Sequence, residues 1–535
     1  MLMQKSIMLI HPPVSVPAAP PAGMARLAGF LRKSGVACLA VDLNLYGLLK
    51  VAGSEITAND TWTRRAKTGL DKNLAALRSC ELYKDRDRYK RAVQDVNRVL
   101  HMAGSQRGIK LSLSNYVDPC RSPLLSRDLM QAALDFKNNL FFPFFEKRIE
   151  AMVKDNNFQV FGISVNFISQ ALCSAAIAGF IRKHFPNSRI VFGGGLITSW
   201  MKIPGFSNPL TGIVDDMISG PGERILAAMC AANAPEDEGV IKYGNNRSQV
   251  PGYPYDYEQD EYLSPGLVFP ISASDGCYWR KCAFCPEKEE QNIYRPFSPR
   301  KISSLFQANG VAWGSDQLNC VKKQVLIHYT DNALSPKFMQ HIIDNPPGSP
   351  WYGFARITSH LADPGFVAGL VASGCIMLKL GIESGDQKVL DTMGKGTSVT
   401  MVSRVLKTLK TCGISVYGYL LFGTPAENER SAIATRDFIL AHSDCIDFLN
   451  LAIFNLPAYG GMADKLQTRA FYPGDLSLYR EFVHPEGWNR EHIRKFLSKV
   501  FQSDKTVRNI ILNDPPFFTS NHAPFFRMHQ FLMTS

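Results

Sequence analysis

The stretch LVFPISASDGCYWRKCAFCP, residues 267–286, decides the fold of the second half of this chain. It begins with a short apolar run, 267–273, which is typical of a buried strand in a parallel sheet. A loop follows directly and carries three cysteines within nine residues, namely Cys277, Cys282 and Cys285. Because a loop can wrap its backbone around a bound group, these thiols are expected to converge on one metal centre.

Three interpretations of this cysteine loop are open. Iron–sulfur clusters use thiolate ligands, and three of them would leave one iron open for a non-protein ligand. A structural zinc site needs a fourth Cys or His, commonly from a second paired motif, and the chain has no other CxxC or CxxH pair. Unrelated core cysteines would not be expected around the charged pair Arg280-Lys281. The residues therefore favour an iron–sulfur cluster.

Apolar runs alternate with helical patterns downstream of the loop. Residues 266–457 contain six strand candidates, at 267–273, 325–330, 351–355, 376–382, 414–422 and 447–455. Helical segments are expected at 335–344, 363–373, 398–411 and 428–441. Six β/α units in order predict a partial (β/α)6 barrel, in which chemistry collects at the carboxyl ends of the strands. Residues 458–535 are rich in aromatic side chains, and we expect them to be helical and to pack across the open barrel.

The amino-terminal half has the same alternation. Strand candidates lie at 5–10, 36–41, 158–165, 189–193 and 212–219, and helices are expected at 22–33, 169–184 and from Gly220-Pro-Gly-Glu223 to about 232. This order predicts an α/β, doubly wound, Rossmann-like domain over 1–232. The polar stretch from about 50 to 150 has apolar residues at helical spacing and is predicted to be a helical insertion. Residues 233–265 lack periodicity and are predicted to be a linker.

Composition excludes several classes of protein. Of the 535 residues, 45% are apolar and 20% are charged, so the chain is not disordered throughout. No apolar run is long enough for a membrane span, and the amino terminus lacks a secretory signal pattern. Twelve cysteines are too few for a disulfide scaffold, so a cytoplasmic protein is expected. The net charge of +12 is scattered along the chain, and no nucleic-acid partner is expected.

The cysteine loop and the strand order resemble those of the radical S-adenosylmethionine (SAM) enzymes over residues 266–457. That family usually has three residues in the first cysteine gap, whereas this chain has four; the second gap is kept, with Phe284 at the family's aromatic position. The resemblance implies that Cys277, Cys282 and Cys285 bind a 4Fe–4S cluster whose fourth iron chelates SAM. It also implies an external electron donor, such as flavodoxin or ferredoxin, and cleavage of SAM to a deoxyadenosyl radical.

The same resemblance assigns cofactor-binding positions at the ends of later strands. Leu380–Gly385 resembles the motif that meets SAM, with Glu383 and Ser384 as candidates; a turn with Glu383 near a helix amino terminus is the alternative. Gly423, after the fifth strand, is where backbone can approach a ligand. Asp331 and Arg356, after the second and third strands, are candidate pocket groups, with a turn or a surface ion pair equally open.

The front domain resembles the cobalamin-binding domains that precede one branch of these enzymes, to which the Gly-Cys-Tyr-Trp opening also points. Glycines at strand ends would let a corrin or its nucleotide tail lie against the backbone, and helix amino termini favour phosphate. The candidate cobalamin residues are Ser164, Gly193, Gly194, Gly195 and Glu223. The Asp-x-His-x-x-Gly motif of a lower cobalt ligand is absent, so His11 is predicted to be a turn histidine. Cobalamin would then bind without a histidine of the protein as cobalt ligand, or the domain would be an evolutionary relic that binds no cofactor.

These features predict a cobalamin-dependent radical SAM enzyme that methylates an unactivated carbon or phosphorus of a small or lipid-like substrate. One alternative is a radical rearrangement or ring-forming enzyme without methyl transfer. Another is a non-catalytic sensor that binds cobalamin or a metal. A methylthiotransferase would need further cluster cysteines in the front domain, where the cysteines are dispersed.

Overall fold

The computed structural model describes residues 5–154, 156–231, 240–242, 259–308 and 325–528. The chain divides into two compact units. The first, here called the front domain, comprises Met1–Pro265 and Tyr472–Leu478. The second, the barrel domain, comprises Gly266–Phe471 and Tyr479–Ser535.

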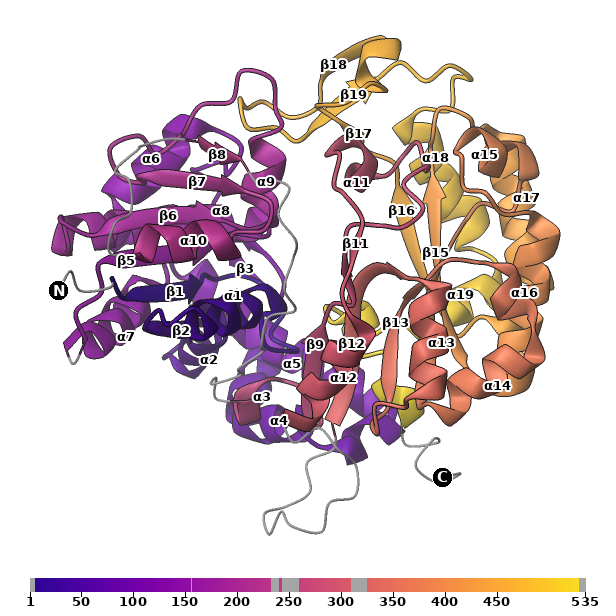
Figure 1. The fold of residues 1–535 in the computed structure, drawn as a ribbon, viewed down its shortest axis with the longest axis horizontal. Coiled ribbons are helices and arrows are strands. Elements are labelled where there is room, and N and C mark those ends of the chain that lie inside the picture. Colours follow the sequence, from indigo (N-terminus) through magenta and orange to yellow (C-terminus); the bar gives the residue numbers. More distant parts are fainter. Residues whose placement is uncertain (1–4, 155, 232–239, 243–258, 309–324, 529–535) are drawn as a thin grey trace. The chain divides into compact units, whose positions relative to one another are not determined.

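A six-stranded parallel sheet forms the centre of the front domain, in the order β2-β1-β5-β6-β7-β8 (Figure 1). Its strands are β1 (Ile7–His11), β2 (Cys38–Asp42), β5 (Val160–Ser164), β6 (Arg189–Gly193), β7 (Asp216–Ser219) and β8 (Val240–Lys242). The direction in which strands are added reverses between β1 and β5. In open α/β sheets, such a switch point is where ligands bind, outside the carboxyl ends of the strands.

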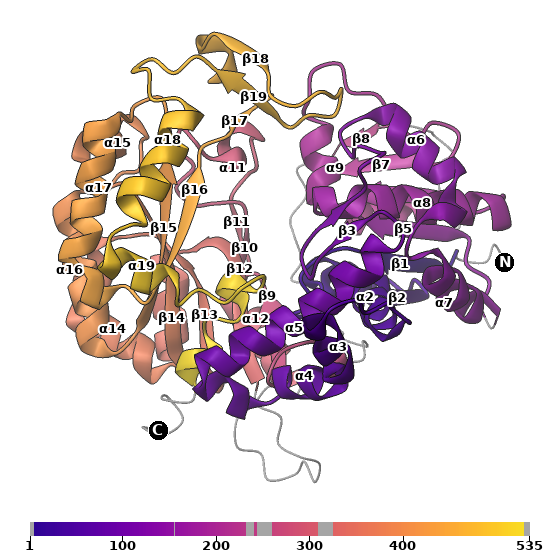
Figure 2. The ribbon, with the colours of Figure 1, turned by 180° about the vertical axis from the view of Figure 1, so that it is seen from behind.

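Helices cover both faces of this sheet, which explains why its central strands are apolar throughout. Helices α1 (Ala22–Lys33) and α10 (Glu223–Cys230) pack together on one face (Figure 1), whereas α7 (Phe142–Lys154) and α8 (Ile168–His184) pack together on the other (Figure 2). The core under α1 and α10 consists of Ile7, Leu9, Met24, Ala28, Leu31, Val36, Val160, Val191, Ile218, Leu226, Met229 and Cys230.

The segment between β2 and β5 is largely helical. It contains α2 (Leu43–Gly53), α3 (Thr61–Thr68), α4 (Leu70–Leu77), α5 (Arg86–Ser105), α6 (Ser126–Leu134) and α7. A short antiparallel hairpin, β3 (Lys110–Leu111) with β4 (Tyr116–Val117), interrupts the helices. In the part of the chain that the structure describes, no helix is long and apolar enough to cross a membrane.

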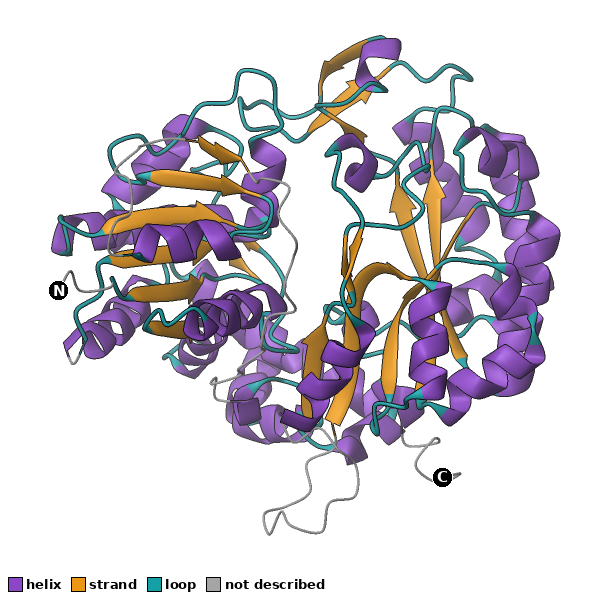
Figure 3. Cartoon of the chain, in the orientation of Figure 1, coloured by secondary structure: helices purple, strands orange, loops and turns teal. Residues whose placement is uncertain are grey.

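The barrel domain contains a second six-stranded parallel sheet in which neighbouring strands follow one another along the chain. Its strands are β9 (Leu267–Ile271), β12 (Val325–Leu334), β13 (Trp351–Ala355), β14 (Cys375–Glu383), β15 (Ser415–Phe422) and β16 (Phe448–Ile453). The connecting helices are α13 (Pro336–Asp344), α14 (Pro364–Ala372), α16 (Val399–Cys412) and α17 (Glu429–Ala441), and they lie along the outer side of the strands (Figure 3). The predicted α/β class, with a doubly wound domain and a partial barrel, is confirmed.

Two expectations about the connecting regions need correction. The tail from 458 is not helical throughout, because β17 (Leu456–Pro457), β19 (Tyr479–Phe482) and β18 (Thr468–Ala470) form a small antiparallel sheet. Pro457 and the Pro473-Gly474 pair disfavour a helix here. Helices resume at α18 (Arg490–Phe496) and α19 (Lys505–Ile511). Within the predicted linker, 240–242 is a strand of the front sheet; 233–239 and 243–258, like 529–535 of the tail, lie outside the described residues.

Candidate active site and cofactor pocket

The cysteine loop leaves the barrel after β9. Arg280, in the longer first gap, has a φ of +53°, so a left-handed residue accommodates the wider spacing. Cys282 is buried, whereas Cys277 and Cys285 are partly exposed. Burial raises the pKa of Cys285 to about 11, so this thiol keeps its proton until a metal displaces it.

Three thiols in one loop match a 4Fe–4S cluster in number and in ligand chemistry. Within the described ranges, no group of three His, Cys, Asp or Glu side chains is arranged to hold a single metal ion. A cubane does not need that arrangement, because each cysteine binds a different iron. The loop therefore fits a cluster with one iron left free of protein.

A glycine-containing turn at residues 393–396, which follows α15 (Gln387–Thr392), holds the cysteine loop in place. The backbone N–H of Ala283 donates to the carbonyl of Met393 at 2.8 Å. The indole Nε1 of Trp279 donates to the carbonyl of Gly394 at 3.0 Å. Gly396 has a φ of +69° and lies against the indole of Trp279, where any side chain would overlap the ring. The turn therefore accepts only glycine at this position.

Lys395, in the same turn, forms a buried ion pair with the predicted SAM residue Glu383. Its Nζ lies 2.6 Å from Oε1 of Glu383, and the two side chains are 8% and 11% exposed. A Cβ at Gly381 would overlap both charged groups, so a side chain there would have to displace the ion pair. Glu383 itself has a φ of +63°, which is uncommon for a residue with a side chain and is often found at functional sites.

The predicted residues Phe284 and Arg356 meet at the same place. The ammonium of Lys395 lies 5.7 Å from the ring centroid of Phe284. Arg356 donates to the carbonyl of Lys395, lies 3.6 Å from Sγ of Cys282 and stacks over Trp279 at 4.3 Å. A guanidinium in this position stabilises negative charge on a thiolate ligand. The structure thus brings Phe284, Glu383 and Arg356 together beside Cys282.

Two other predicted residues hold the surrounding backbone. Asp331 accepts hydrogen bonds from the backbone N–H of Ala273 at 2.8 Å and from the hydroxyl of Ser274 at 2.6 Å, so it fixes the start of the cysteine loop. Burial raises the pKa of Asp331 to about 6. Ser384 is 1% exposed, and its hydroxyl contacts that of Thr435 on the outer helix α17 at 3.1 Å.

Gly423 lies at the carboxyl end of β15 beside a small cavity of about 30 Å³. It has a φ of +80°, and a Cβ there would overlap Ile493. Its backbone N–H donates to the buried carboxylate of Glu427, which also accepts from Nε1 of Trp488 at 3.1 Å. Burial raises the pKa of Glu427 to about 7. Glu427 therefore supports the backbone at the end of this strand.

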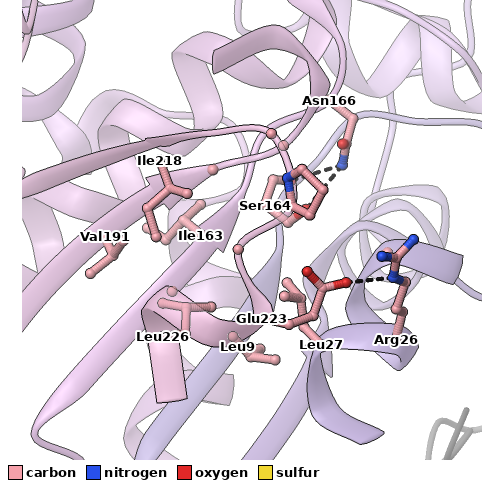
Figure 4. Close-up of a pocket in the computed structure, with 17 residues that line it drawn as sticks. Leu9, Arg26, Leu27, Ile163, Ser164, Asn166, Val191, Ile218, Glu223 and Leu226 are labelled. Carbon is pink, nitrogen blue, oxygen red and sulfur yellow. Dashed lines mark hydrogen bonds and ion pairs between the residues drawn. The ribbon is translucent and has the colours of Figure 1, made fainter. Parts of the chain in front are cut away.

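A cavity of about 190 Å³ opens at the carboxyl end of the front-domain sheet (Figure 4). Apolar side chains from the sheet, α1 and α10 line its floor, and these are Leu9, Leu27, Ile163, Val191, Ile218 and Leu226. Four predicted cobalamin residues also line it, namely Ser164, Gly193, Gly194 and Glu223, and Gly195 does not. Glu223 is held there by an ion pair with Arg26 of α1.

The two glycines at the rim of this cavity have different roles. A Cβ on Gly193 would meet only one atom within 4 Å, the carbonyl oxygen of Ile218 at 3.9 Å, so this glycine leaves open space. Gly194 has a φ of +103°, and its Cβ would meet the carbonyl oxygen of Val165 at 2.6 Å. Gly194 is therefore required by the backbone, whereas Gly193 keeps the cavity open.

His11 lies at the end of β1 and does not line the cavity. It is 5% exposed, and its Nε2 lies 2.9 Å from the hydroxyl of Ser15. Burial lowers its pKa, although Asp42 opposes that shift. His11 is thus a buried, neutral histidine. That it does not ligate the cobalt of cobalamin remains a prediction.

Sequence reasoning did not single out Lys395, Trp279 or Arg26. Trp279 stood inside the quoted cysteine loop and Lys395 stood beyond the motif Leu380–Gly385, and the partners of both lie on other segments. The available signal in the sequence was opposite charge: Lys395 lies in a glycine-containing turn that follows Glu383 at the end of a strand.

Comparisons with known proteins bear on the barrel domain and on the fold of the chain. The radical SAM superfamily model matches residues 271–439. A bacteriochlorophyllide d C-12(1)-methyltransferase of Chlorobaculum tepidum is 28% identical over 180 residues, covering 32% of this chain and 37% of that protein. A protein of Methanocaldococcus jannaschii, named provisionally as a methylthiotransferase, is 40% identical over 283 residues, covering 49% and 60%. The chain thus spans about half the length of these curated relatives.

Two solved structures share the fold over most of the chain. The cobalamin-dependent SAM radical enzyme OxsB, with aqua-cobalamin and SAM bound, has a TM-score of 0.51 and 15% identity, covering 100% of this chain and 61% of that one. The radical SAM methyltransferase TsrM of Kitasatospora setae, with tryptophan and a SAM analogue bound, has a TM-score of 0.51 and 15% identity, covering 88% and 79%. The chain therefore carries a radical SAM domain and has the fold of the cobalamin-dependent radical SAM enzymes.

Proposed function

We propose that this protein is a radical SAM enzyme that uses cobalamin to methylate an unactivated carbon or phosphorus centre of a small or lipid-like substrate. One observation carries the proposal: Arg356 after β13, Glu383 at the end of β14 and Lys395 in the turn 393–396 converge near Cys282. A surface loop of structural cysteines would not need buried charges from two strand ends and a separate turn. A site that binds a cluster and a charged cofactor does need them.

Each part of the site has a distinct task. Cys277, Cys282 and Cys285 would ligate the cluster, and Arg356 would stabilise the charge on Cys282. Glu383 and Lys395 present an acceptor and a donor at the end of β14, where the polar groups of SAM would lie. Bound here, a reduced 4Fe–4S cluster supplies the electron that cleaves SAM to a 5′-deoxyadenosyl radical.

The front-domain cavity supports the cobalamin part of the proposal. Its apolar floor would take an aromatic base, and Gly193 leaves room at the strand end for the chain that joins base to corrin. Bound here, cobalamin supplies the methyl group in the proposed reaction. Two of the relatives and structural neighbours are named as methyltransferases, which favours methyl transfer.

Radical chemistry without methyl transfer is a second candidate. It is favoured by OxsB, which shares the fold and is named as a cobalamin-dependent radical enzyme with no mention of methylation. An electron donor such as flavodoxin or ferredoxin, a cytoplasmic location and the absence of a nucleic-acid partner remain predictions.

The proposal is tested with anaerobically reconstituted protein, reductant, hydroxocobalamin and SAM labelled in its methyl group. Wild type is expected to form 5′-deoxyadenosine and to transfer label to cobalamin. The variant with Cys277, Cys282 and Cys285 all replaced by Ala is expected to form no deoxyadenosine. Deoxyadenosine without label on cobalamin would favour the rearrangement enzyme, and bound cobalamin with no deoxyadenosine would favour the sensor.

A further inference from the structure

The inner face of the half-barrel contains charged and aromatic side chains that the proposed cofactor sites do not use. Strand alternation separates the two faces of β12: Tyr329 packs on Phe338 of the outer helix α13, so His328 faces inward. Tyr352 lies beside His328 in the strand register, and the two rings stack at 4.3 Å with an angle of 5°. Lys379 lies on the same inner face.

Lys379 is held within an aromatic cage. Its Nζ lies 3.0 Å from Nε2 of His328. The same ammonium lies 4.5 Å from the ring centroid of Phe354 and 5.2 Å from that of Tyr352. Phe354 in turn contacts Tyr419 at a centroid distance of 4.9 Å. Lys379 is only 3% exposed, whereas Phe354 and Tyr419 remain partly open, so the cage has an accessible side.

The cage lacks a negative charge. Among the described residues, no carboxylate forms an ion pair with Lys379, and Nε2 of His328 is the hydrogen-bond acceptor for its ammonium, which has three N–H donors. The nearby carboxylate of Asp514 accepts a hydrogen bond from the hydroxyl of Tyr417, at 2.5 Å. Burial of a lysine without an acidic partner is costly, and an anion from outside the chain would remove that cost.

We propose that Lys379, positioned by His328 and the rings of Tyr352 and Phe354, binds the carboxylate of a substrate whose body is aromatic or otherwise apolar. The anion supplies the missing counter-charge, and the rings contact the apolar body. The inference rests on the proposed function, because it takes the interior of the half-barrel as the substrate side.

The titration of the cage makes the proposal measurable. Burial lowers the pKa of Lys379 to about 7 and that of His328 well below its usual value. The facing phenols of Tyr352, Tyr417 and Tyr419 have raised pKa values and stay neutral below pH 10. An anion that binds only the protonated lysine therefore loses about tenfold in affinity between pH 6 and pH 8.

Benzoate and benzyl alcohol are the probes, and calorimetry on reconstituted protein is the measurement. Wild type is expected to bind benzoate at least tenfold more tightly than benzyl alcohol at pH 6, and to lose about tenfold by pH 8. Lys379→Met, which keeps similar volume, is expected to lose this preference and its pH dependence. Lys410→Met, on the exposed side of α16, is the matched control and is expected to retain both.

Each outcome decides the proposal. Benzoate binding that is absent in wild type, or unchanged in Lys379→Met, overturns it. Circular dichroism and the cluster absorbance check that the variant is folded, and the pH dependence in wild type tests the same claim without any substitution. Cleavage of SAM by wild type is measured separately: its absence would overturn the proposed function while leaving the benzoate result to stand on its own.

Discussion

The ion pair between Glu383 and Lys395 gives the sharpest prediction about the site. Replacing Glu383 by Ala leaves the ammonium of Lys395 buried without its partner at 2.6 Å. Removing one member of a buried pair costs about 3–5 kcal/mol of stability, because the remaining charge is uncompensated. Glu383→Ala and Lys395→Met are therefore each expected to destabilise the barrel domain by about that amount.

The double variant separates the interaction energy of the ion pair from the cost of each single substitution. Replacing a whole buried pair by apolar groups is often close to neutral. Glu383→Ala combined with Lys395→Met is thus expected to cost much less than the sum of the two single changes. Urea unfolding of all four proteins measures the coupling. If the losses of stability in the two single variants add up in the double variant, the buried ion pair between Glu383 and Lys395 is refuted.

The same four proteins test contact with SAM. Loss of a buried hydrogen bond to the ligand is worth about 1–3 kcal/mol, or roughly 5- to 150-fold in affinity. If Glu383 contacts SAM, the double variant binds SAM weakly even though its stability is restored. Wild-type affinity in the folded double variant would remove Glu383 from the SAM site.

Three further predictions concern other parts of the chain. Gly193→Leu is expected to abolish cobalamin retention on gel filtration because its side chain enters the cavity, whereas Gly53→Leu, on a helix with equally open space, should retain it; retention by both would place cobalamin elsewhere. The pKa of Asp331 rises from 3.8 to about 6 on folding, so the folded state takes up its proton first. Wild type should therefore gain about 2 kcal/mol relative to Asp331→Asn as the pH falls from 6 to 4 in urea unfolding, and a constant difference would contradict this. Gly396→Ala is expected to displace Trp279 and lower the iron content, and an unchanged content would show that the turn does not hold the cysteine loop.

Much of the fold is readable from the sequence because its strands are buried on both sides. The expected strands at 189–193 and 351–355 coincide with β6 and β13, since each apolar run is bounded by residues that end a strand. The sheet at 456–482 was missed because its strands are only two to four residues long, and β17 pairs with a segment more than twenty residues away.

The site was less predictable because its contacts join segments that are distant in the sequence. Glu383 and Phe284 were singled out from motifs. Lys395 could be identified as a site residue only from the structure, where the turn 393–396 packs against the cysteine loop. Gly194 was expected to face the ligand, yet its Cβ would meet the backbone of Val165. Lys379 needs the register of β12 to β14 before its partner, His328, can be identified. Local patterns thus locate strand ends, whereas side-chain partners depend on register.

The central claim is that Cys277, Cys282 and Cys285 bind a cluster with an iron open to SAM. The most direct measurement is the electron paramagnetic resonance spectrum of the reduced, reconstituted protein, recorded with and without SAM. The account predicts the signal of a reduced 4Fe–4S cluster that changes shape when SAM is added, and no such signal when all three cysteines are replaced by Ala. A cluster signal that persists in the triple variant, or that does not respond to SAM, would contradict it.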